Sequence, residues 1–120
     1  MSCLFDSLSV FLEHMNSKML RSTICDYLET NPLLIDDLKA SEVIHHETNM
    51  EIDIYVSNMR NQSTMGGAIE IRAFTKIFQV NVKVLSIPNQ KVIEFLENPH
   101  FEWFVVQWTG NHFDPIKIQS

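Results

Sequence analysis

Three residue types that catalyse acyl transfer together lie at opposite ends of the sequence. Cys3 is near one end, and His112 and Asp114 occur in "HFDPI" near the other. If this second segment is extended, alternate side chains share a face, so His112 and Asp114 point the same way. The carboxylate can then bind one imidazole nitrogen and leave the other free to take a proton. A thiol, an imidazole and a carboxylate supply a nucleophile, a base and an orienting group.

The neighbourhood of Cys3 favours a reactive thiol. Apolar residues recur at helical spacing after it and predict a helix over residues 3–16 with Cys3 in its first turn; they are Leu4, Phe5, Leu8, Phe11, Leu12 and Met15. The positive end of a helix favours a thiolate, and lowering a thiol pKa by two units is worth roughly 2.7 kcal/mol. Taken alone this inventory is weak evidence, because five histidines and fifteen acidic residues make a His-x-Asp unremarkable.

The composition is that of one globular domain over residues 1–120. Hydrophobic residues make up 45% of the chain, and the formal net charge is -6 without any cluster of Lys or Arg. We therefore expect no nucleic acid partner and no anionic membrane partner. The sequence has neither an apolar run of about 18 residues nor the pattern of a signal peptide, which predicts a soluble, cytoplasmic protein with reduced thiols at Cys3 and Cys25.

Helical patterns come first along the chain and strand patterns come last. Helices are predicted over 18–30, 49–60 and from residue 67 to about 78, where Glu70 suits the positive helix end. A short helical turn is predicted over 33–38 and a loop or short helix over 40–50. Strands are predicted in "VNVKV", "KVIEFL", "FEWFVVQW" and "HFDPIKI". This order indicates an α+β domain whose small, mainly antiparallel sheet packs between helices.

Five segments together resemble the ovarian tumour (OTU) family of cysteine proteases, most of whose active members are deubiquitinases. They are "CLFDSLS", "LRSTICDYLETNP", "YVSNMRN", "MGGAIEIRAFTKIFQVNVKVLS" and "GNHFDPI", and they occur in the family's order and spacing. The resemblance runs from Cys3 to about Ile118. It implies a papain-like cysteine protease fold of OTU type.

The resemblance also implies roles for individual residues. Cys3 matches the nucleophile, His112 the general base and Asp114 the residue that orients it. Ser2 and Cys3 would form the oxyanion hole. Trp108, Gly110 and Asn111 are the predicted substrate-binding residues, although Trp108 is equally expected of a sheet packed on helices. The substrate would be ubiquitin or a ubiquitin-like protein joined to another protein, cut after its terminal glycine by a monomeric enzyme.

Two departures from the family pattern leave alternatives open. The family usually reads Asp-Gly-x-Cys, whereas only Met1 and Ser2 precede Cys3, so the domain is expected to be N-terminally truncated relative to that pattern. Met65 stands where the family tends to have Trp, and it can fill the same apolar space. A catalytically impaired module that binds ubiquitin or another protein is therefore the alternative to a peptidase, and a start upstream of Met1 is a third reading.

The remaining chemistry-bearing residues have structural interpretations. We expect Cys25 to be buried in the second helix. His45, His46 and Glu47 lack further Cys or His ligands nearby, so solvated positions are favoured over a metal site. No cofactor and no metal are expected.

Overall fold

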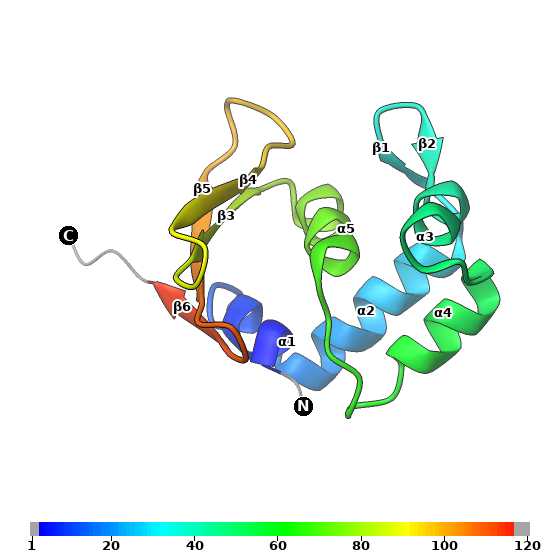
Figure 1. Cartoon of the computed structure of the whole chain (residues 1–120), viewed down its shortest axis with the longest axis horizontal. Helices are drawn as coiled ribbons and strands as arrows, with labels where there is room; N and C mark the ends of the chain where they lie inside the picture. Colours follow the sequence, from blue (N-terminus) through cyan, green and yellow to red (C-terminus); the bar gives the residue numbers. More distant parts are fainter. Residues whose placement is uncertain (1–2, 117–120) are drawn as a thin grey trace.

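The computed structural model describes residues 3–116, apart from the side chain of Cys3. The elements are α1 (Cys3–Ser9), α2 (Ser17–Glu29), β1 (Leu33–Ile35), β2 (Leu38–Lys39), α3 (Ala40–Thr48), α4 (Ile52–Met59), α5 (Ala68–Phe78), β3 (Asn81–Ser86), β4 (Lys91–Phe95), β5 (Trp103–Trp108) and β6 (Phe113–Ile116) (Figure 1). In this part of the chain, no helix has the length and apolar character that crossing a membrane requires.

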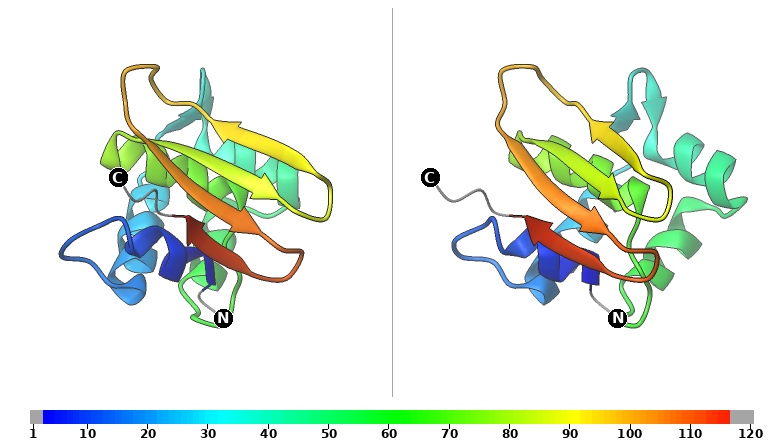
Figure 2. Two further views of the ribbon diagram at one scale, coloured as in Figure 1. Left: turned by 90° about the vertical axis from the view of Figure 1, so that its left-hand side faces the viewer. Right: turned by 60° about the vertical axis from the view of Figure 1, so that its left-hand side comes forward.

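The four C-terminal strands form one sheet in the order β4-β3-β5-β6. The central pair, β3 and β5, is parallel, and both outer pairs are antiparallel. The predicted α+β class with a mainly antiparallel sheet is thus confirmed. Figure 2 shows the sheet in front with the helices behind it, so the helices cover one face of the sheet and do not enclose it from both sides as predicted.

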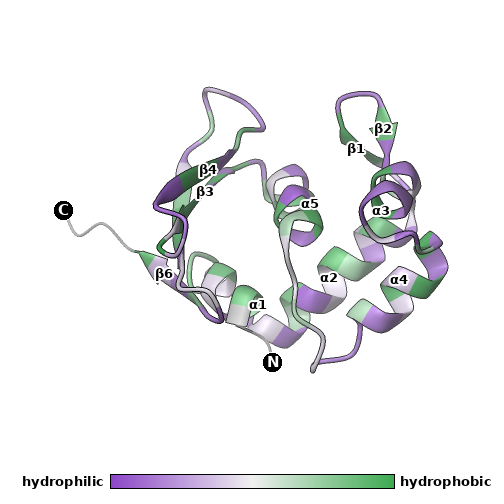
Figure 3. Cartoon of the chain, viewed as in Figure 1, coloured by the Kyte–Doolittle hydropathy of each residue, from purple (hydrophilic) through white to green (hydrophobic). Residues whose placement is uncertain are grey.

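The core fills the space between the sheet and the helices. Val82 of β3 and Val106 of β5 are fully buried, and so is Phe74 of α5, whose ring centroid lies 6.0 Å from that of Phe104 in β5. Polar and apolar residues alternate around α2, α4 and α5, as helices with one buried face require (Figure 3). The sheet is therefore anchored mainly through α5 and α1.

The predicted helix over 3–16 was wrong in its length, because α1 ends at Ser9. Backbone bonds from Phe11 N–H to Leu8 O and from Leu12 N–H to Ser9 O tighten the chain into a turn. Asn16 then begins the next helix by accepting the Met19 N–H at 2.8 Å. Phe11, Leu12 and Met15 pack against the core from a loop. Helical spacing of apolar residues does not by itself distinguish such a loop from a helix.

The helical turn predicted over 33–38 was also wrong, since these residues form the hairpin of β1 and β2. Asp36 adopts a left-handed φ of 49°, which a helix does not allow, while Leu34 is fully buried. The Ala40 N–H closes the hairpin by donating to Pro32 O at 2.7 Å. For residues 40–50, the helical alternative is correct, because α3 occupies most of that range.

Candidate active site

The imidazole of His112 and the carboxylate of Asp114 form a hydrogen-bonded pair at the start of β6. The distance from His112 Nε2 to Asp114 Oδ1 is 2.9 Å, and each side chain is about half exposed, at 51% and 49%. This contact follows from extended backbone, where residues two apart share a face. It involves Nε2, so the predicted contact between the two side chains is confirmed.

The turn before β6 fixes where His112 lies. The backbone N–H and the hydroxyl of Thr109 both donate to the carbonyl oxygen of His112, at 3.0 and 3.2 Å. Gly110 has a φ of 111°, and a side chain there would meet Pro88 at 3.2 Å. The turn between β3 and β4 thus supports the turn that carries the imidazole.

The predicted nucleophile begins the helix that packs beside this strand. Cys3 is the first residue of α1, and α1 packs against β6 and, less extensively, β5. In Figures 1 and 2, the start of α1 lies toward the turn between β5 and β6. The fold therefore brings the first and the last described elements of the chain together. The predicted oxyanion-hole residue Ser2 and the side chain of Cys3 lie outside the described residues.

The predicted substrate-binding residues occupy different surroundings. Asn111 is exposed, accepts a hydrogen bond from the Thr109 hydroxyl at 3.3 Å and lies in the same turn as Gly110 and His112. Trp108 packs on Phe113 with ring centroids 4.6 Å apart and is only partly exposed. Trp108 thus supports β6 from the core side, whereas Asn111 and Gly110 are open to a ligand.

A buried polar network on the opposite side of α1 was missed by sequence reasoning. Arg21 of α2 donates to Met59 O at 2.8 Å and lies over the ring of Phe5, 4.2 Å from its centroid. Glu70 of α5 is fully buried and accepts hydrogen bonds from the Tyr55 hydroxyl at 2.6 Å and the Gly67 N–H at 2.7 Å. Both residues hold the segment 59–67, which connects α4 to α5.

Burial raises the pKa of Glu70, although its hydrogen bonds with Tyr55 and Gly67 oppose that shift. Burial and the neighbouring carboxylate also raise the pKa of Tyr55. The Tyr55 hydroxyl therefore stays protonated and remains a donor to Glu70. Glu70 was predicted only to complement a helix dipole, and no local pattern indicated its burial.

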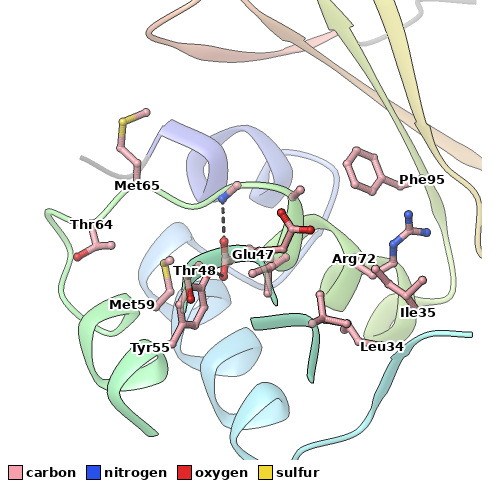
Figure 4. Close-up of a pocket in the computed structure, with 15 residues that line it drawn as sticks. Leu34, Ile35, Glu47, Thr48, Tyr55, Met59, Thr64, Met65, Arg72 and Phe95 are labelled. Carbon is pink, nitrogen blue, oxygen red and sulfur yellow. Dashed lines mark hydrogen bonds between the residues drawn. The ribbon is translucent and has the colours of Figure 1, made fainter. Parts of the chain in front are cut away.

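A pocket of about 540 Å³ lies beside this network, between α3, α4, the segment 64–67 and α5 (Figure 4). Its lining is mostly apolar and includes Leu34 and Met65, and its acidic and basic residues are Glu47, Glu70 and Arg72. His112 and Asp114 are not among the residues that line it. The segment 64–67 lines the pocket on one side and contacts α1 through Gly66.

Cys25 is fully buried, as predicted, and burial raises the pKa of its thiol from 9.0 to about 11. His45, His46 and Glu47 are exposed on α3, which agrees with their interpretation as solvated residues. Within residues 3–116, no cluster of three or more Cys, His, Asp or Glu side chains could hold a metal ion.

Comparison with known proteins supports the resemblance. Residues 2–104 match the family model of the OTU-like cysteine proteases. Cys3 lies inside this match, whereas His112 and Asp114 lie beyond it. Ubiquitin thioesterase Otu1 of Drosophila melanogaster is 25% identical over 99% of this chain and 33% of its own length. Ubiquitin thioesterase OTU1 of Danio rerio is 27% identical over 97% of this chain and 38% of its own length.

The fold has solved counterparts as well. An OTU domain solved in complex with ubiquitin superposes with a TM-score of 0.76 at 22% identity, over 95% of this chain and 62% of that one. This likeness identifies the papain-like fold of OTU domains. The chain spans between 33% and 38% of the length of the two curated relatives. Because the family model covers most of the sequence, the chain belongs to the family of OTU-like cysteine proteases.

Proposed function

We propose that this chain is a thiol-dependent deubiquitinase. It would hydrolyse the isopeptide or peptide bond after the C-terminal glycine of ubiquitin or a ubiquitin-like protein. Membership of a cysteine protease family and the similarity to two ubiquitin thioesterases support the proposal. The observation that carries it is the 2.9 Å pair of His112 and Asp114 on a strand that packs against the helix of Cys3.

The reaction would proceed in two acyl-transfer steps. The Cys3 thiolate attacks the carbonyl carbon of the terminal glycine, and protonated His112 gives its proton to the departing amine as the C–N bond breaks. Water then attacks the resulting thioester while His112 accepts a proton from it. The thioester C–S bond then breaks, which regenerates the Cys3 thiolate beside protonated His112, and the released glycine carboxyl group loses its remaining proton to solvent.

Other residues would hold the reacting groups in place. Asp114 accepts a hydrogen bond from the imidazole and fixes its orientation. Backbone N–H groups around Ser2 and Cys3 would stabilise the oxyanion. The exposed turn with Gly110 and Asn111 would contact the glycine-ended tail of the substrate. The monomeric state and the cytoplasmic location stay predictions from the sequence.

The test is a ubiquitin probe that carries an electrophile at its C-terminus. We expect incubation with the purified chain to give a covalent adduct, read as a mass shift, because the probe places the electrophile where the scissile carbonyl would lie. Cys3→Ala should abolish the adduct, and His112→Ala should slow it strongly. Cys25→Ala should leave it in place, since that thiol is buried.

Failure would separate the two candidate functions. A folded wild-type chain that binds ubiquitin in a titration but forms no adduct would overturn the peptidase assignment and favour a binding module. The pocket of about 540 Å³ beside α3 and α5 is the observation that favours this second candidate. An adduct that persists in Cys3→Ala would instead show that the assigned nucleophile is wrong.

A further inference from the structure

Gly66, in the segment 59–67, packs closely against the first turn of α1. A Cβ atom added at Gly66 would lie 2.9 Å from Leu4 Cδ2 and 3.0 Å from Phe5 Cε2, closer than carbon atoms normally approach. Leu4 and Phe5 directly follow Cys3 in α1. The backbone at Gly66 therefore forms the surface on which the start of this helix rests.

Glu70 holds that surface in place. One carboxylate oxygen accepts the Gly67 N–H at 2.7 Å, and the other accepts the Tyr55 hydroxyl at 2.6 Å. Gly67 is the residue after Gly66 and the N-cap of α5. The carboxylate thus joins the Gly67 backbone to both α4 and α5.

Arg21 of α2 is a second link between the segment 59–67 and α1. Its guanidinium lies 4.2 Å from the centroid of the Phe5 ring and donates to Met59 O at 2.8 Å. Arg21 is 3% exposed and Glu70 is fully buried. Burying charged groups is costly, so such groups are weak evidence for stability. Their hydrogen bonds nevertheless join the segment to α2, α4 and α5.

We propose that Glu70 is a positioning residue, which acts through Gly67 and Gly66 to set where the first turn of α1, and hence Cys3, lies relative to His112. This inference rests on the proposed function, in which the thiol and the imidazole must meet. A misplacement of about 1 Å far from the reacting atoms can cost about 100-fold in rate, so a loosened Gly66 is expected to impair the reaction without touching the substrate.

The test measures the maximal inactivation rate and the half-saturating concentration of the electrophilic ubiquitin probe for four variants. Glu70→Ala and Gly66→Ala should lower the maximal rate at least tenfold, with the half-saturating concentration changed less than twofold. Glu70→Gln should stay within threefold of wild type, because its amide oxygen can still accept the Gly67 N–H. The maximal rate of Gly67→Ala should be at least fivefold higher than that of Gly66→Ala, since a Cβ at position 67 meets nothing within 4 Å.

Plain destabilisation needs its own control. Leu28 is fully buried in the last turn of α2, so Leu28→Ala creates a core cavity without altering the Glu70 bonds. All variants are assayed where unfolding curves show them to be folded. If Leu28→Ala lowers the maximal rate as much as Glu70→Ala, or if Glu70→Gln fails to rescue it, the positioning role is overturned.

A second readout does not depend on ubiquitin. The rate at which iodoacetamide alkylates Cys3 near neutral pH, followed by peptide mass, reports how the imidazole and helix activate the thiol. Glu70→Ala and Gly66→Ala should slow it at least fivefold, and Glu70→Gln should not. If the wild type gives no ubiquitin adduct, the proposed function fails while this rate still tests the positioning. Equal alkylation rates in all variants would overturn the inference.

Discussion

At the scale of single residues, Asp114 is the side chain whose role can be isolated most cleanly. Its bond to His112 is half exposed, so Asp114→Ala should change the free energy of unfolding by less than about 1 kcal/mol. It should nevertheless lower kcat about 100-fold, because the imidazole loses its orientation. Asp114→Asn should lose less, since an amide oxygen can also accept the ring N–H.

Steady-state hydrolysis of a ubiquitin substrate and urea unfolding check this prediction for Asp114. The matched control is Asp37→Ala, which removes an exposed carboxylate from the turn between β1 and β2. A value of kcat for Asp114→Ala within threefold of the control would mean that Asp114 does not orient the base.

Cys25 makes the stability of the protein depend on alkaline pH. Burial raises the pKa of its thiol from 9.0 to about 11, so the unfolded chain loses this proton first. The contribution of this thiol to the free energy of unfolding is complete below pH 9 and is lost as the pH rises toward 11. The unfolding free energy of wild type relative to Cys25→Ala should fall by about 2 kcal/mol over this range.

Urea unfolding of the two proteins at several pH values from 8 to 11 measures the Cys25 contribution. Taking the difference cancels the titration of groups that both chains share. A difference that stays constant with pH would show that the Cys25 thiol is accessible to solvent in the folded protein.

At the scale of elements, Asn81 connects β3 to the loop between β4 and β5. Its amide donates to Asn98 O and Phe101 O at 2.8 and 3.0 Å and accepts the Glu97 and Asn98 N–H groups at 2.7 and 3.1 Å. Asn81→Ala leaves several of these groups without a partner and should destabilise the fold by roughly 2 to 4 kcal/mol. Hydrogen exchange should become faster in residues 96–102.

Asn89→Ala is the control for Asn81, because Asn89 is exposed and makes one 3.3 Å bond to Ser86. It should change the unfolding free energy by less than about 0.5 kcal/mol. Equal effects of the two substitutions on stability would show that the buried amide contributes little to the loop.

The elements also show which features a sequence can predict. The alternation of Val80, Val82 and Val84 correctly predicted β3, and the spacing of His112 and Asp114 predicted their contact, because both depend on local periodicity. The hairpin at Asp36 depends on a left-handed φ that this residue adopts in context.

The buried polar network around Arg21 and Glu70 could not be predicted in the same way. Arg21 and Met59 are 38 residues apart, and only the packing of α2, α4 and α5 brings such groups together. Glu70 has the same local pattern as an exposed carboxylate in a first helical turn. Its burial is decided by what the rest of the chain places over it.

At the scale of the whole molecule, the first and last described elements meet, since α1 packs against β6. The loop after α1 reinforces this contact through Phe11, whose ring stacks on Phe104 of β5 with centroids 4.5 Å apart and planes 12° apart. The ring of Phe104 also lies beside that of Phe74 in α5, with centroids 6.0 Å apart. One aromatic cluster thus joins the N-terminal segment, the central helix and the sheet.

This arrangement predicts energetic coupling between segments that are distant in the sequence. In a double-mutant cycle, Phe11→Leu and Phe104→Leu should show a coupling free energy of about 0.5 to 1.5 kcal/mol in urea unfolding, because each change removes the same stacked pair. The control cycle pairs Phe11→Leu with Phe95→Leu, since Phe95 lies on the edge strand β4 beneath Arg72. Its coupling should be below about 0.5 kcal/mol. Equal coupling in both cycles would mean that the N-terminal segment is held by general compaction, and the stacked pair would then not explain how α1 is held against the sheet.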